Sequence, residues 1–91
     1  MTDDGWRVEI TRPAARDLKR LDAPVRERIL AAFDGLKTDP ATTGDIKRLT
    51  GPKPPQWRLR VGDWRVRFNR NHDTRTVLIL RVLPRGRAYR D

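Results

Sequence analysis

The segment QWRLRVGDWRVRF, residues 56–68, constrains the fold more than any other stretch of this chain. Apolar side chains alternate with arginines on both sides of a Gly-Asp pair, and such alternation places the two kinds on opposite faces of a strand. Gly62-Asp63 suits a two-residue hairpin turn with glycine at its first central position. The predicted β-hairpin sets these residues opposite each other: Val61 and Trp64, Arg60 and Arg65, Arg58 and Arg67.

Like charges that face each other across two strands destabilise a sheet. Two interpretations of the arginine pairs remain open. A bound polyanion compensates for the repulsion, or the arginines form a solvated face that salt screens. The apolar face of the hairpin, with Trp57, Leu59 and Phe68, is expected to belong to the core.

Two helices are predicted before this hairpin. Residues 6–10 alternate as in a half-buried strand, and Thr11 then caps a short helix with an apolar stripe. A second helix starts after Asp22 and is ended by Pro40. The stripes of the two helices, expected to pack on the sheet, are: Ala14, Leu18 and Leu21; Val25, Ile29, Ala32, Phe33 and Leu36.

The remaining pattern completes a single domain, residues 1–91. Residues 40–55 hold four of the seven prolines and read as an irregular connection. The apolar run 77–83 predicts a central strand covered on both faces, with Arg81 on the face of Ile79 and Leu83. The expected fold is α+β: a small antiparallel sheet of about four strands, in the order β-α-α-β-β-β, packed against an N-terminal helical hairpin.

Positive charge is concentrated towards the end of the chain. The formal net charge is +9, and residues 57–91 hold ten arginines against three aspartates. Arginine presents a planar fork that suits phosphate, so this region is the predicted nucleic-acid-binding surface. Lys47 and Arg48 either join it or are solvated loop residues. The candidate RNA-binding residues are: Lys47, Arg48, Arg67, Arg81 and Arg87.

Composition also narrows the chemistry. The chain has no cysteine and one histidine, which excludes disulfides and argues against a protein-ligated metal centre. No cofactor is expected. The start of the chain does not resemble a signal peptide, and no apolar run approaches the roughly 20 residues of a membrane span. The chain is therefore expected to be a cytoplasmic protein with no membrane partner.

Nearly the whole chain resembles the RelE/ParE superfamily of toxins from type II toxin–antitoxin systems. The resemblance is carried by a strand, a helical hairpin, the KRLTG segment, the WRLRVGDWRVRF hairpin, and an apolar strand running into LPRGRAYR. It implies a RelE-like, ribosome-dependent and metal-free messenger-RNA endonuclease. The catalytic residues that the resemblance implies are: Arg58, Arg60, Arg65, Arg85 and Tyr89.

The resemblance assigns these residues to cleavage by the RNA's own 2′-hydroxyl. Arg60 and Arg65 would bind the scissile phosphate, and Arg58 would contact the backbone or stabilise charge. Arg85 would act on the leaving-group side or on the charge of the transition state. Tyr89 would stack on a base or act as the general base, or else only cover the end of the sheet. Arg87 competes with Arg85 for the late-arginine role.

Partners follow from the same resemblance. An antitoxin with an acidic amphipathic segment, messenger RNA in the ribosomal A site, and the ribosome itself are expected. The alternative functions are a ParE-like, non-enzymatic inhibitor of DNA gyrase and a nuclease-dead basic module that binds RNA. In the ParE-like case the arginines would serve only the antitoxin.

Overall fold

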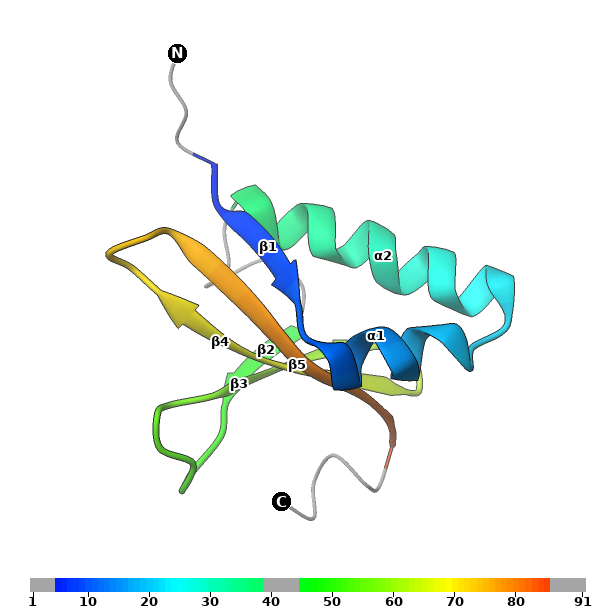
Figure 1. The fold of residues 1–91 in the computed structure, drawn as a ribbon. Helices are drawn as coiled ribbons and strands as arrows, with labels where there is room; N and C mark the ends of the chain where they lie inside the picture. The colour runs from blue at the N-terminus through cyan, green and yellow to red at the C-terminus, as the bar shows by residue number, and fades with distance from the viewer. Residues whose placement is uncertain (1–4, 39–44, 86–91) are drawn as a thin grey trace.

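The computed structural model describes residues 5–38 and 45–85, which form two helices and a five-stranded sheet. Both helices lie on the same side of the sheet (Figure 1). The predicted α+β class and the helical hairpin are confirmed. In chain order the elements are: β1 (Arg7–Ile10), α1 (Arg12–Lys19), α2 (Ala23–Thr38), β2 (Asp45–Arg48), β3 (Trp57–Val61), β4 (Trp64–Asn71) and β5 (Thr76–Pro84).

The strands are arranged in the order β1-β5-β4-β3-β2. Neighbours from β2 to β5 run antiparallel, but β1 runs parallel to β5, with Arg7 opposite Thr76. The expectation of an entirely antiparallel sheet was therefore wrong at this edge. Because β1 and β5 are not joined by a hairpin, no tight turn forces them to be antiparallel.

β2 is the fifth strand, and it lies inside the segment that was expected to be irregular. It pairs with β3, from Asp45 opposite Arg60 to Arg48 opposite Trp57. The strand has only four residues, and Ile46 is its one apolar side chain. So short an alternation does not identify a strand by itself, and pairing with β3 supplies the hydrogen bonds that hold it.

The helices pack as the apolar stripes predict. Thr11 caps α1, where its Oγ1 accepts a hydrogen bond from the Ala14 N–H at 3.3 Å. Neither helix of the described part is long and apolar enough to cross a membrane. The buried apolar core between helices and sheet consists of: Ala14, Leu18, Ile29, Phe33, Leu36, Leu59, Val66, Phe68, Val77, Ile79 and Val82.

A bulge in β5 changes which way its side chains point. Arg67 of β4 lies opposite Arg81, but the next residue, Phe68, lies opposite Ile79, which leaves Leu80 as the extra residue. Ile79 and Val82 are therefore both buried under the helices. Arg81 starts from the face of its partner Arg67, and its exposed side chain reaches Asp17 of α1. The prediction that Arg81 and Ile79 share a face of the strand was wrong for this reason.

The predicted full cover of β5 was also wrong. Both helices lie on one side of the sheet (Figure 1), and there Val77 and Ile79 are buried. Leu78, Leu80 and Leu83 stay only half-buried. An apolar run thus indicated a strand correctly, but it did not tell how many layers cover that strand.

Candidate nucleic-acid interface

The β3–β4 hairpin has the predicted register. Gly62 has φ +57°, a left-handed conformation that favours glycine. A Cβ atom added there would lie 3.2 Å from Nη1 of Arg28, the end of an exposed side chain, so the positive φ rather than lack of space favours glycine. The confirmed pairs are: Val61 and Trp64, Arg60 and Arg65, Arg58 and Arg67.

Cations from four adjacent strands form one row across the sheet. The row runs from Lys47 in β2 through Arg58 and Arg67 to Arg81 in β5. The neighbouring row contains Arg60 and Arg65, and the residues between the two rows face the helices and the core. We call this side of the sheet the arginine face, defined by: Lys47, Arg58, Arg60, Arg65, Arg67 and Arg81.

Two arginines of this face are buried rather than solvated. Arg58 is 5% exposed and Arg65 only 1%. The Nη1 of Arg65 donates to the carbonyl oxygens of Gly62 and Trp64, each at 3.2 Å. Arg65 therefore ties its guanidinium to the hairpin turn, and its positive charge lies beneath the surface.

The other arginines of the hairpin are more accessible. Arg60 has a side chain that is 45% exposed, and Arg67 donates from Nη2 to Oε1 of Gln56 at 2.6 Å. Arg85 is exposed just after β5, and its backbone N–H donates to the Asp63 carbonyl at 2.8 Å. The fold thus brings Arg58, Arg60 and Arg65 together and fixes the backbone of Arg85 to the same turn.

Asp45 adds a carboxylate to the arginine face. Its Oδ1 lies 3.7 Å from Nη2 of Arg58, and its Oδ2 lies 3.7 Å from Nη1 of Arg60. Sequence reasoning missed this residue because it lies in the segment that was expected to be irregular. The only signal was the short alternation Asp45-Ile46-Lys47, which places the aspartate on the side of the lysine.

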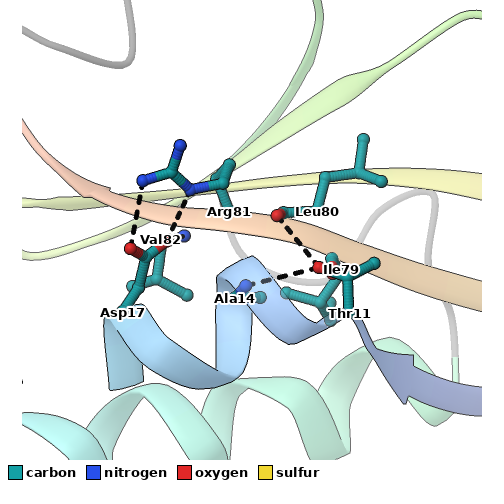
Figure 2. A network of polar contacts seen from close by, with 7 residues as sticks. All are labelled: Thr11, Ala14, Asp17, Ile79, Leu80, Arg81 and Val82. Atoms are coloured by element: carbon teal, nitrogen blue, oxygen red, sulfur yellow. Dashed lines mark hydrogen bonds and ion pairs between the residues drawn. The ribbon is translucent and has the colours of Figure 1, made fainter. Parts of the chain in front are cut away.

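A second carboxylate, Asp17 of α1, holds Arg81. The Nε and Nη2 of Arg81 donate to the two oxygens of Asp17 at 2.8 and 3.1 Å, and the Val82 N–H donates to Oδ2 at 2.9 Å (Figure 2). Asp17 is only 8% exposed. Arg81, a candidate RNA-binding residue, is therefore engaged in joining α1 to β5.

The environment of Asp17 changes its acidity. Burial by itself raises the pKa of Asp17, but the hydrogen bonds from Arg81 and Val82, with the charges of Arg81 and Arg20, outweigh burial and lower the pKa below its ordinary value. A signal for this residue was present in the sequence, because Asp17 stands three residues after Ala14 on the apolar side of the helix.

The remaining candidates lie apart from the arginine face or beyond the described ranges. Arg48 points to the other side of the sheet, where its Cζ lies 6.0 Å from the ring centroid of Trp57. Tyr89 and Arg87 lie outside the described residues. Within residues 5–38 and 45–85, no three histidine or acidic side chains form a group that could hold a metal ion.

The fold and this site define a class of protein: a small α+β domain with a cationic row across one face of its sheet. Residues 8–89 match the family model of the ParE toxin of the type II toxin–antitoxin system parDE. A curated protein of Methanocaldococcus jannaschii named "Putative toxin RelE1" is 32% identical over 88 residues, which covers 94% of this chain and 97% of the relative.

Two solved structures extend the comparison. The archaeal RelE–RelB complex from Pyrococcus horikoshii has a TM-score of 0.78 at 30% identity, covering 90% of this chain and 97% of the other. The RelBE2 toxin–antitoxin complex from Mycobacterium tuberculosis has a TM-score of 0.76 at 29% identity, covering 89% and 99%. The chain belongs to the RelE/ParE superfamily of toxins of type II toxin–antitoxin systems.

Proposed function

We propose that this toxin is a ribosome-dependent endoribonuclease that cleaves translated messenger RNA in the ribosomal A site. The observation that carries the proposal is the gathering of Arg58, Arg60 and Arg65 beside the turn of the β3–β4 hairpin. Further support comes from relatives named RelE that match most of the chain at about the same level of identity. Both the target, translated messenger RNA, and the reaction, its cleavage, are proposed from the arginine cluster together with these relatives.

The proposed reaction is attack of the RNA's own 2′-hydroxyl on the adjacent phosphate. It needs in-line geometry, stabilisation of charge on the non-bridging oxygens, and a proton for the 5′-oxygen that leaves. Arg60, which is half-exposed, is assigned the direct contact with these oxygens. The buried charges of Arg58 and Arg65 would act from behind it and strengthen the positive potential at the phosphate.

The 2′-hydroxyl proton is assigned to a base at the end of the chain, and the 5′-oxygen that leaves takes a proton from water at the ribosomal site. Arg85 would stabilise charge on the leaving-group side, with Arg87 as the competing candidate. Tyr89 would be the general base or a stacking partner, and a phenol with an ordinary pKa of about 10 needs neighbouring cations to ionise. Arginine stays protonated at any accessible pH, so an arginine cannot accept the proton in place of Tyr89. We therefore expect poor cleavage by the free protein.

An antitoxin is the proposed second partner. Support comes from the two related structures, which are complexes of a toxin with its antitoxin. The net charge of +9 favours a partner with an acidic segment. In this proposal the antitoxin neutralises the arginine face and the end of the chain when no cleavage is needed.

The test is to map messenger-RNA 5′ ends in cells that briefly express the toxin. We expect new cuts inside translated regions, in register with codons. Arg60→Ala should abolish these cuts, because it removes the exposed phosphate contact, and should leave the folded state intact. Arg65→Ala should abolish them too, and it should also lower the melting temperature because its two contacts with the turn are lost. The same messenger-RNA cuts in Arg60→Ala as in the wild type would contradict the proposal.

A second candidate function is favoured by the family model, which describes a ParE toxin. A ParE-like protein would inhibit DNA gyrase through protein contacts, without any reaction of its own. Cells that express the toxin also distinguish the gyrase inhibitor from the endonuclease. DNA that is cleaved and trapped on gyrase, with messenger RNA left intact, would support the gyrase inhibitor. Binding of RNA without cuts, unchanged by Tyr89→Phe, would instead indicate a nuclease-dead module.

A further inference from the structure

Asp45 occupies a position that a phosphate group would suit. Its two carboxylate oxygens lie 3.7 Å from two different guanidiniums, those of Arg58 and Arg60. A phosphate offers two non-bridging oxygens to a pair of arginines in the same manner. The β2–β3 register, with Asp45 opposite Arg60 and Lys47 opposite Arg58, holds the carboxylate there.

The contacts of Asp45 are weak enough to be exchanged. At 3.7 Å they are too long for hydrogen bonds, and the Asp45 side chain is 54% exposed, so water and salt screen the attraction. Asp17 differs in both respects, because it bonds Arg81 at 2.8 Å and is buried. The pair of Asp17 with Arg81 is therefore fixed, whereas a competing anion can displace the contacts of Asp45 with Arg58 and Arg60.

We infer that Asp45 is an internal competitor for the phosphate that Arg60 contacts and that the buried charge of Arg58 attracts. In the free toxin the carboxylate partly neutralises the two arginines, and an incoming RNA phosphate takes its place beside Arg60, where the charge of Arg58 also attracts it. Asp45 thereby lowers the affinity for RNA that binds through these arginines alone. A substrate that is also held by additional contacts can still bind. The inference rests on the proposed function, because it takes RNA as the polyanion, but it requires no cleavage step.

The experiment measures RNA binding without cleavage. A fluorescein-labelled, fully 2′-O-methylated RNA oligonucleotide cannot be cut by 2′-hydroxyl attack, and its anisotropy reports Kd. Asp45→Asn should tighten Kd about three- to tenfold, the change expected from removing one screened charge contact. The matched control is Asp34→Asn in α2, which also removes an exposed, ion-paired carboxylate, that of the pair with Lys37. We expect it to change Kd less than about twofold.

Two further measurements separate competition from other effects. Arg60→Gln removes one partner of Asp45, so adding Asp45→Asn to it should tighten Kd much less than in the wild type. Thermal melting identifies any variant that is not folded, and Asp45→Ser then replaces Asp45→Asn. Equal tightening by the Asp45 and Asp34 variants, or weaker binding by Asp45→Asn, would overturn the inference. A toxin that makes no messenger-RNA cuts but shows the predicted tightening would overturn only the proposed function.

Discussion

Asp17 joins α1 to β5 through polar contacts. Its carboxylate receives three hydrogen bonds, two from Arg81 and one from the Val82 N–H (Figure 2). Removing one partner of such a buried network leaves the other groups without full compensation. Arg81 contributes here to stability, whatever else it contacts.

We expect acid to destabilise the protein through Asp17. The pKa of Asp17 is lowered in the folded state, so its ionised form stabilises the fold at pH values above the unfolded pKa of about 3.9. This stabilisation is lost as the pH falls through the lower folded-state pKa. Urea unfolding at pH 7 should show Asp17→Asn less stable by about 1–3 kcal/mol.

The difference between the wild type and Asp17→Asn should shrink as the pH is lowered from 5 to 2, because both side chains are then uncharged. Asp34→Asn serves as the control, with an expected change under about 0.5 kcal/mol at every pH. A constant difference between wild type and Asp17→Asn across that range would contradict the assigned pKa direction.

At the scale of elements, Thr11 joins β1, α1 and β5. Its backbone N–H donates to the Ile79 carbonyl at 3.1 Å. The hydroxyl lies 2.9 Å from the same oxygen and 3.1 Å from that of Leu80, while it also caps α1 (Figure 2). It lies where β1 ends and the bulge of β5 begins, so one side chain satisfies backbone groups that the strands leave open.

Thr11→Ala should destabilise the protein by about 1–2 kcal/mol, because it removes both the helix cap and the hydrogen bond to β5. Thr11→Ser keeps the hydroxyl and should recover most of this loss. Chemical unfolding of the two variants measures the difference. Equal stability of the alanine and serine variants would show that the hydroxyl does not join these elements.

For the whole molecule, charge sets how strongly a nucleic acid binds. The net charge is +9, and the arginine face gathers cations from β2, β3, β4 and β5 on one side of the sheet. Each neutralised phosphate of a single strand contributes a slope of about −0.7 to the log–log dependence of affinity on salt. The binding of RNA should therefore be strongly dependent on ionic strength.

We expect Kd for a single-stranded RNA to rise about 20- to 50-fold between 50 and 200 mM salt, as for three or four phosphate contacts. Anisotropy titrations at several salt concentrations measure the slope. An uncharged morpholino oligonucleotide of the same sequence is the control and should not bind. A Kd that is independent of salt would mean that the arginine face does not contact phosphates.

The sequence alone determined the elements whose signals are local. The turn residues Gly62 and Asp63, with strict alternation on both sides, specified the hairpin and its register, and the period of the apolar residues specified both helices. The gathering of Arg58, Arg60 and Arg65 follows from that register, so most of the candidate site was accessible before the structure. Such signals lie within a few residues of each other along the chain.

Only the tertiary structure decided the contacts between distant segments. Asp17 and Arg81 are 64 residues apart, and neither the parallel pairing of β1 with β5 nor the pairing of β2 with β3 leaves a mark on local periodicity. The bulge at Leu80 changes which side chains of β5 face the helices beyond that residue. The burial of Arg65 depends on how the chain packs around it. Partners of this kind are selected by packing and charge after the elements have come together, so the sequence pattern does not contain them.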